Sequence, residues 1–197
     1  DVGAWRAPRV GNWWEREPQS VTDSLTYGGF YTQDDIREVV EYARERFITV
    51  VPEIDVPGHS MALLTAYPEI SCTGGPFHVN VGNTFYTKEE NSLCVGKEKT
   101  FAILDMIFDE LVDLFPSSYI HIGGDECYKG FWAKCPDCRA RMSSKQLQNV
   151  EELQSYFVKR VASHMQSKGK HVIGWDEILE GGLAKDTIVM SWRGMKG

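Results

Sequence analysis

The spacing of apolar residues alternates between two periods along the chain. In the first stretch with helical spacing, Thr32 is followed three positions later by Asp35, the pattern of a capping box at a helix start. The apolar residues that follow recur on one helical face and are Ile36, Val39, Val40, Ala43 and Phe47. We therefore predict a helix that begins after Thr32 and reaches Phe47.

Two later stretches show the same helical period. One covers residues 96–115 and is closed by Pro116, and the other covers residues 149–168 and stops at Gly169, as expected for residues that end helices. Their apolar stripes are Phe101, Leu104, Phe108, Leu111, Val112 and Phe115 in the first, and Leu153, Phe157, Val161 and Met165 in the second. Both are predicted to pack one face against a core.

Short runs rich in β-branched residues separate these helices. They predict strands at residues 47–54, from Tyr119 onward, at 171–176 and at 187–193, with Pro52 where the first strand runs out into a loop. Strands that alternate with helices predict a parallel sheet with right-handed crossovers.

Polar and aromatic residues gather where the predicted strands end. Several strands that supply such residues to one rim are typical of a TIM (β/α)8 barrel, whereas an open sheet binds ligands at one switch point. No glycine-rich phosphate loop follows any of these strands, so we favour the barrel. The residues are Glu53 and Asp55, Asp125 and Glu126, Trp175 and Asp176, and Trp192 and Arg193.

The run at residues 119–126, YIHIGGDE, is the strongest indication of chemistry. An apolar strand there ends in Gly123 and Gly124, and two adjacent carboxylic acids, Asp125 and Glu126, follow. We read the glycines as leaving space for a ligand against the backbone, or else as a bulge. The structural alternative for the acids is a helix-capping Asp followed by a solvated Glu.

Composition excludes some classes of function. The chain has 197 residues, 42% of them hydrophobic, and a net charge of -7, which fits one domain or a large part of one. Clustered Lys and Arg are missing, so no nucleic acid is expected as a partner. No apolar run approaches the ~20 residues of a membrane span. The chain opens at Asp1 and leaves its cellular compartment open.

The five cysteines leave several interpretations. Their odd number excludes complete internal pairing. Cys135 and Cys138, with Cys127 nearby, could suggest zinc or a disulfide. A second CxxC or a close pair of histidines is missing, so free thiols or one local disulfide are favoured over a structural metal.

Five sequence blocks together resemble one enzyme family. They are residues 27–36 (YGGFYTQDDI), 51–59 (VPEIDVPGH), 121–126 (HIGGDE), 174–177 (GWDE) and 191–194 (SWRG). In this order and spacing they are similar to the β-N-acetylhexosaminidases of glycoside hydrolase family 20. The resemblance implies a retaining glycosidase, without cofactor or catalytic metal, that removes terminal N-acetylglucosamine or N-acetylgalactosamine from glycans or chitooligosaccharides. It also implies a secreted, periplasmic or lysosomal protein.

The resemblance assigns roles to the matching acids. In this substrate-assisted mechanism the sugar's own acetamido oxygen attacks C1 and forms an oxazolinium ion. Glu126 is expected to act as general acid and then base, and Asp125 to orient the acetamide and offset its charge. His59 is expected in a relay that tunes Glu126; the alternative is that it only ties down the Pro57–Gly58 turn.

The aromatic and remaining polar residues are less specific. By resemblance Trp175 and Trp192 wall the acetamido pocket, with ordinary core packing as the alternative. His121 is read as a hydrogen-bonded core histidine, and a metallohydrolase with His59, His121 and Asp125 as ligands has no supporting spacing. Asp176 and Glu177 either touch sugar hydroxyls or brace a loop. No role follows for the loop aromatics Trp13, Trp14 and Trp132.

The extent of the match limits the expected activity. A full barrel takes about 250 residues and eight strands, and the resemblance places this chain at about strands 3 to 6 of one catalytic domain. Residues 1–197 are then part of one (β/α)8 domain whose flanking strands and other domains lie outside the chain. The chain alone is expected to be inactive and to self-associate through exposed strand edges. A catalytically silent carbohydrate-binding barrel and a structural fragment are the alternative functions.

Overall fold

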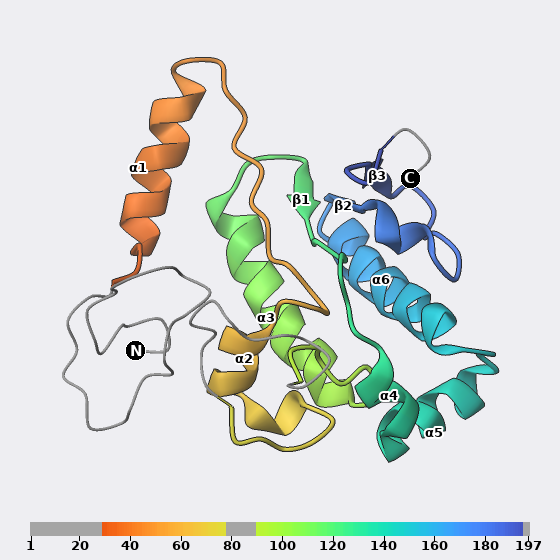
Figure 1. Cartoon of the computed structure of the whole chain (residues 1–197). Helices are drawn as coiled ribbons and strands as arrows, with labels where there is room; N and C mark the ends of the chain where they lie inside the picture. The colour runs from red at the N-terminus through yellow and green to blue at the C-terminus, as the bar shows by residue number, and fades with distance from the viewer. Residues whose placement is uncertain (1–28, 78–89, 195–197) are drawn as a thin grey trace.

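The computed structural model describes residues 29–77 and 90–194, in which helices and short strands alternate (Figure 1). Trp13 and Trp14 lie outside the described residues. The elements are α1 (Gln33–Arg44), α2 (Met61–Ala66), the 3-10 helix η2 (Pro68–Ile70), α3 (Glu98–Leu114), β1 (Tyr119–His121), α4 (Gly130–Lys134), α5 (Pro136–Lys145), α6 (Val150–Ser167), β2 (His171–Trp175), the 3-10 helix η3 (Asp176–Leu179) and β3 (Ile188–Met190).

The described strands form a parallel sheet in chain order. β1 pairs with β2 through Tyr119 and His171, and β2 pairs with β3 through Ile173 and Ile188. The predicted parallel arrangement is therefore confirmed for these strands. β2 and β3 are shorter than predicted, because the chain turns into η3 at Asp176 and leaves the ladder after Met190.

The predicted strand at residues 47–54 is reduced to a single parallel bridge between Glu53 and His121. His121 N–H donates to the Pro52 carbonyl at 2.9 Å, and Ile54 N–H donates to the His121 carbonyl at 3.0 Å. Continuing the ladder toward the start of β1 would need an N–H donor at residue 52, which proline lacks. The segment therefore lies beside β1 without forming a regular strand.

The predicted helices are largely confirmed. Thr32 caps α1 with the reciprocal capping box to Asp35, but α1 ends at Arg44, and Phe47 is fully exposed with φ 59°. The prediction that Phe47 belongs to the helical face is wrong, because the chain has already left the helix. α3 and α6 occupy the two later stretches, and Asn149 caps α6 through a hydrogen bond to Glu152 N–H.

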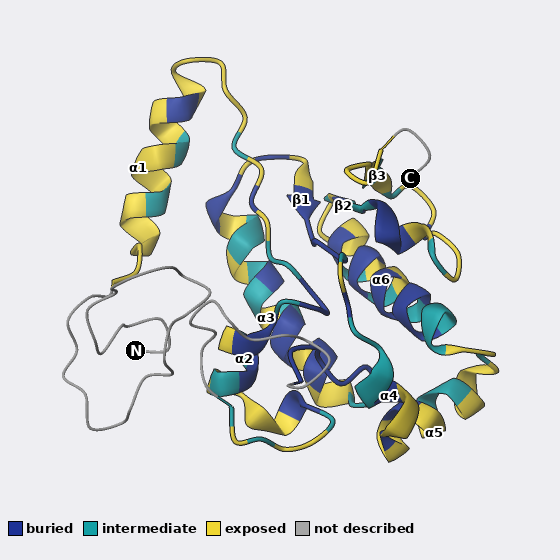
Figure 2. Cartoon of the chain, in the orientation of Figure 1, coloured by how far each residue is buried: buried dark blue, intermediate teal, exposed yellow. Residues whose placement is uncertain are grey.

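The core lies between the sheet and these two long helices (Figure 2). Phe101 of α3 packs on Phe157 of α6 with ring centroids 5.7 Å apart, and both Ile120 and Ile122 are completely buried. In contrast to α3 and α6, α1 buries only Ala43.

Within the described residues, no helix combines the length and apolar character needed to cross a membrane.

Three short helices, α2, α4 and α5, were not predicted. They interrupt the loops after residue 55 and after β1, and their few residues carry too little periodicity to be read from sequence. Trp132 on α4, expected as a loop aromatic, is completely buried and its indole N–H donates to the Leu93 carbonyl at 2.9 Å. It is a core residue.

Candidate active site

The ends of two neighbouring extended segments bring three predicted residues together. His59 follows the 50–54 segment, and Asp125 and Glu126 follow β1. His59 Nε2 lies 3.5 Å from Asp125 Oδ2 and 3.6 Å from Glu126 Oε2. The side chains of Asp125 and Glu126 therefore meet at one place, where the imidazole of His59 contacts both.

Backbone geometry explains how adjacent acids reach one place. Gly123 and Gly124 have φ 68° and 97°, and Glu126 has φ 44°, in the left-handed region that side chains rarely adopt. A Cβ at Gly123 would lie 1.8 Å from Asp55 Oδ1, and one at Gly124 would lie 2.5 Å from Ile178 Cγ2. The prediction that these glycines leave room for a ligand is wrong, since protein side chains fill that space.

Asp55 adds a third carboxyl group. Its Oδ1 accepts a hydrogen bond from Gly124 N–H at 3.2 Å, and its Oδ2 is 4.0 Å from His59 Nε2. Burial, then the charge of Asp125, raises the pKa of Asp55 to about 8. Asp55 is therefore protonated at neutral pH, and it shares a hydrogen bond with Asp125. Two close carboxyl groups hold one proton between them in this way.

Exposure differs between the two candidate acids. The Asp125 side chain is 17% exposed and that of Glu126 is 48% exposed. Asp125 Oδ1 is buried and has no hydrogen-bond partner among the residues that the structure describes. A buried carboxylate oxygen without a donor is costly, whereas the exposed 17% of the Asp125 side chain is the part open to a ligand.

The metal ligands considered from sequence do not come together as a set. Asp55, His59 and Asp125 offer atoms within 4.8 Å of one another, and His121 is not among them.

His121 is 5% exposed, as predicted for a core histidine. Its Nδ1 accepts a hydrogen bond from Gly123 N–H at 3.1 Å and lies 3.2 Å from Glu53 Oε1. Burial lowers the pKa of His121 despite the nearby acids. Its Nε2 has no partner within the described part of the chain, so its polar groups are only partly satisfied.

The predicted aromatic residues follow the next two strands. Trp175 packs against His121 with ring centroids 4.6 Å apart and ring planes tilted by 60°, and its indole N–H donates to Glu53 Oε1 at 3.1 Å. Trp192 is 51% exposed and its indole N–H donates to Glu177 Oε2 at 3.0 Å. Trp192 is therefore not a core residue, and its orientation is set by a hydrogen bond.

Asp176 and Glu177 brace this rim. Asp176 is completely buried, and its carboxylate accepts hydrogen bonds from Arg193 Nε at 2.7 Å and from Trp192 N–H at 3.2 Å. Burial by itself would raise the pKa of Asp176, but these donors outweigh it and the pKa is lowered. Of the two roles left open by the sequence, loop bracing is the one that these contacts support.

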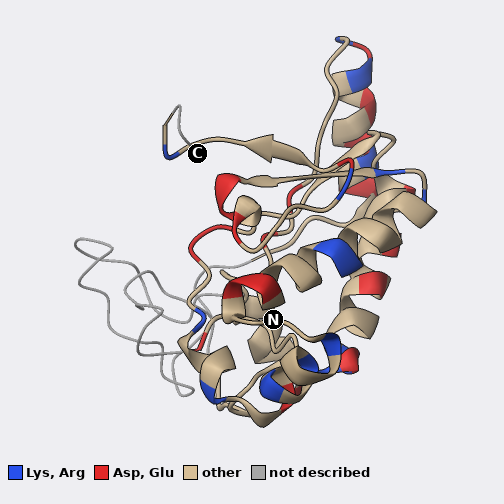
Figure 3. Cartoon of the chain, turned by 90° about the vertical axis from the view of Figure 1, so that its right-hand side faces the viewer, with Lys and Arg blue, Asp and Glu red and all other residues tan. Residues whose placement is uncertain are grey.

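Sequence reasoning placed Glu53 and Asp55 at the rim of the site but assigned neither of them a role. The available signal was their alternation across Ile54, which places both acids on the same side of an extended segment. Acidic residues recur after β2 as well, in η3, whereas Lys and Arg are scattered over several helices in the view of Figure 3. Carboxyl groups thus recur at the ends of these segments within the described part of the chain, and Arg193 pairs with those of η3.

Comparison with known families decides the relationship. The model of the glycosyl hydrolase family 20 catalytic domain matches residues 1–197. The chain belongs to glycosyl hydrolase family 20. It is 48% identical over 175 residues to a β-hexosaminidase of Porphyromonas gingivalis, which covers 89% of this chain and 22% of that protein. A β-hexosaminidase of Vibrio furnissii is 39% identical over 193 residues, 98% of this chain and 31% of that protein.

Solved structures of family 20 members have the same fold. The X-ray structure of Flavobacterium johnsoniae chitobiase matches 87% of this chain and 26% of its own with a TM-score of 0.77 and 42% identity. A β-N-acetylhexosaminidase from Bacteroides fragilis matches 85% of this chain and 33% of its own, with a TM-score of 0.75 and 39% identity. These matches confirm the TIM-barrel catalytic domain as the fold class. The chain spans about a fifth to a third of the length of these relatives.

Proposed function

We propose that the protein containing this chain is a retaining β-N-acetylhexosaminidase that removes terminal N-acetylglucosamine or N-acetylgalactosamine from glycans or chitooligosaccharides. The observation that carries the proposal is the contact of one imidazole, that of His59, with both Asp125 and Glu126 at 3.5 and 3.6 Å. Family membership and a family 20 exo-β-N-acetylglucosaminidase of Vibrio harveyi solved in complex with N-acetylglucosamine support the substrate class.

The first step needs an acid and an orienting carboxylate. The acetamido carbonyl oxygen of the substrate attacks C1 while the bond from C1 to the leaving oxygen breaks. The leaving oxygen takes the proton of Glu126, which is the more exposed acid and can reach it. Asp125 accepts the acetamide N–H through its carboxylate and offsets the positive charge that forms on the oxazolinium ion.

The second step returns the proton. Water attacks C1 from the side that the leaving group vacated and gives its proton to Glu126. The bond between C1 and the acetamido oxygen breaks, so the acetamide is restored and the configuration at C1 is retained. Asp55 keeps its own proton through both steps and donates to Asp125, which fixes the orientation of the Asp125 carboxylate.

His59 and the two tryptophans position these groups. His59, in contact with Glu126, tunes the proton affinity of the acid. The faces of Trp175 and Trp192 enclose the acetamido methyl group and hold its oxygen near C1, so that the attack becomes effectively unimolecular.

The proposed extent of the domain is strands 3 to 6 of one (β/α)8 barrel, with the remaining strands contributed by chain outside residues 1–197. Exposed apolar residues at both sides of the described sheet support this: Ile48 is 59% exposed on one side, and Ile188 and Met190 are 41% and 45% exposed on the other. The isolated 197-residue chain is accordingly expected to lack activity and to self-associate, which an assay and light scattering would check.

The test uses the full-length protein with nitrophenyl N-acetylglucosaminide and N-acetylgalactosaminide. Turnover of at least one is expected, together with a loss of about 100- to 10,000-fold in kcat for Glu126→Gln and for Asp125→Asn. The exposed Asp34→Asn on α1 serves as the matched control and should retain wild-type kcat. Sugar binding without turnover in the wild-type protein would show instead a catalytically silent carbohydrate-binding barrel.

A further inference from the structure

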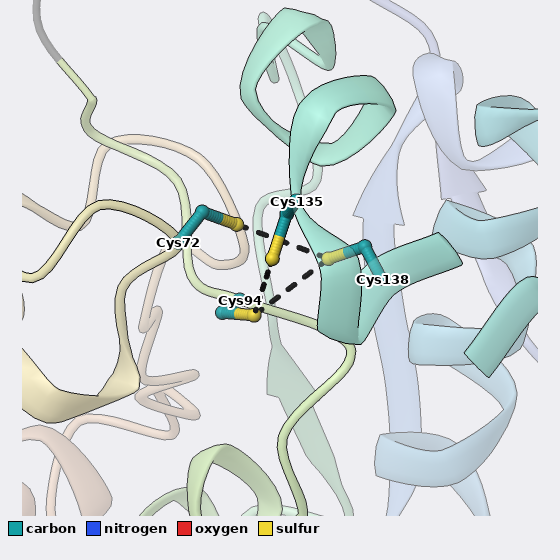
Figure 4. Close-up of side chains that lie close together, drawn as sticks. All are labelled: Cys72, Cys94, Cys135 and Cys138. Carbon is teal, nitrogen blue, oxygen red and sulfur yellow. Dashed lines mark hydrogen bonds between the residues drawn. The ribbon is translucent and has the colours of Figure 1, made fainter. Parts of the chain in front are cut away.

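Four of the five cysteines, from three separate segments of the chain, converge at one place (Figure 4). Cys94 Sγ lies 3.7 Å from Cys135 Sγ and 3.6 Å from Cys138 Sγ. Cys72 Sγ lies 3.8 Å from Cys138 Sγ. All four sulfur atoms are within 4.8 Å of one another. We call these residues, Cys72, Cys94, Cys135 and Cys138, the cysteine cluster.

These distances fit one chemistry better than the others. Disulfide sulfurs are about 2.05 Å apart, and each pair measured here is well beyond bonding distance. Four thiolates around one zinc ion at about 2.3 Å place neighbouring sulfurs about 3.8 Å apart, the edge of the tetrahedron. We propose that the cysteine cluster is a structural site for one tetrahedrally coordinated zinc ion.

The ligand set corrects the interpretation of the cysteines from sequence. Spacing alone offered Cys135 and Cys138 with Cys127 as the nearby third cysteine, and the set was incomplete. In the structure Cys127 is not part of the cluster, and Cys72 and Cys94 supply the two missing thiols. Four sulfur ligands complete a closed structural site, without the open position that a catalytic zinc requires.

The backbone around the cluster is built for close approach. A Cβ at Gly96 would lie 2.2 Å from the Asp137 carbonyl carbon and 2.4 Å from Cys138 N, so only glycine lets the segment of Cys94 touch the start of α5. The indole N–H of Trp132 holds the Leu93 carbonyl next to Cys94. Cys94, Cys135 and Cys138 are buried, while Cys72 is half-buried and gives an ion access.

Two cations flank the cluster. Lys97 Nζ donates to the Ser71 carbonyl at 2.7 Å, one residue before Cys72. Arg141 Nη2 donates to the Gly96 carbonyl at 3.1 Å, two residues after Cys94. Zinc with four thiolates carries a net charge of -2 by formal count. Lys97 offsets part of this charge, whereas Arg141 is also paired with Glu98 at 2.6 Å.

The ion would join the loops that carry the proposed catalytic residues. Cys72 and Cys94 belong to the long segment after His59, and Cys135 and Cys138 lie at the junction of α4 and α5, shortly after Glu126. Closing contacts between residues 66 positions apart restricts the unfolded chain and fixes one loop against the other. The site is thus structural, and its presence does not depend on the proposed glycosidase activity.

The decisive measurement is the metal content of the full-length protein purified without added zinc. Elemental analysis should find one zinc per chain. Cys138→Ser and Cys94→Ser should fall below about a tenth of that content, because each removes one of the four ligands. Cys127→Ser is the matched control outside the cluster and should retain the full zinc content.

A second measurement covers the case in which the buried variants do not fold. Wild-type protein unfolded in a chelator and refolded with Co²⁺ should show the absorption bands of tetrahedral thiolate coordination. Cys72→Ser, at the half-buried position, should weaken and shift these bands. Removing zinc should also lower the Tm of wild type and of Cys127→Ser.

Three results would overturn the proposal. They are purified wild-type protein that holds iron or no metal, failure of zinc-free protein to bind either Zn²⁺ or Co²⁺, and a mass spectrum that shows disulfides among the four cysteines in freshly purified protein. Loss of zinc with intact hydrolysis, or hydrolysis absent with zinc bound, would separate this proposal from the proposed function.

Discussion

The Gly124 backbone N–H donates a 3.2 Å hydrogen bond to Asp55 Oδ1, so an acid at the end of one extended segment fixes the turn that follows the next strand. The same carboxyl group occupies the space beside Gly123. The orientation of Asp125 and Glu126 therefore depends on a residue that takes no part in bond breaking.

The first prediction concerns this close approach. Gly123→Ala should destabilise the protein and abolish activity, because its Cβ would lie 1.8 Å from Asp55 Oδ1 at φ 68°. Gly169→Ala, at φ 73° with nothing within 4 Å, isolates the backbone term of about 1 to 2 kcal/mol. Gly123→Ala should cost about 1 to 3 kcal/mol more. Urea unfolding of both variants measures the difference, and equal losses would contradict the predicted clash.

The second prediction is a pH dependence of stability. The pKa of Asp55 is raised to about 8 in the folded protein, against about 3.9 when unfolded. Between these values the folded state binds the extra proton, so the free energy of unfolding should fall as pH rises from about 4 to about 8. Asp55→Asn cannot ionise and should lose this slope.

Unfolding in urea at several pH values within this window measures the effect. Asp34→Asn, on the exposed face of α1, is the control and should keep the wild-type slope. If wild type and Asp55→Asn showed the same change in the free energy of unfolding between pH 4 and pH 8, a protonated carboxyl group at this position would be contradicted.

The third prediction distinguishes the two acids. Glu126→Gln removes the proton for the leaving oxygen, so kcat/KM for a chitooligosaccharide should fall far more than for a dinitrophenyl glycoside, whose leaving group departs without protonation. Asp125→Asn weakens the attack of the acetamide and should affect both substrates alike. Comparison of the four kcat/KM ratios in the full-length protein checks this, and equal sensitivity of the two variants would argue against the assigned roles.

The fourth prediction concerns Trp192. Arg193→Gln removes the cation that holds Asp176 at 2.7 Å, so the turn that carries Trp192 should loosen. We expect KM to rise several-fold while kcat changes less, since substrate positioning is affected before chemistry. Arg37→Gln, which breaks the exposed 2.8 Å ion pair with Asp34, should leave KM unchanged. Equal KM values for both variants would remove Trp192 from the proposed acetamido pocket.

Much of the fold follows from local sequence signals. The capping box at Thr32 and the apolar stripes of α3 and α6 act within one helix, where each residue's neighbours are three or four positions away. The positions of the strands also follow from local runs of β-branched residues, but the lengths of the strands do not. Pro52 removes one donor and reduces the predicted strand at residues 47–54 to a bridge, which depends on pairing with β1.

The candidate site likewise combines residues that local sequence reveals with residues whose roles depend on contacts far apart in the sequence. Asp125 and Glu126 were recognisable because the acids follow two glycines at a strand end. The role of Asp55 was not, since its raised pKa comes from burial and from Asp125, 70 positions away in the sequence. The cysteine cluster joins segments separated by up to 66 positions, and spacing within one segment carries no information about such a set.

The strands of the described sheet lie side by side in the order in which they occur along the chain. Each strand and its following loop therefore build one wall of the proposed pocket, and neighbouring walls come from consecutive stretches of sequence. Exchange of a single strand and loop with a relative would replace one wall while the others stay in place.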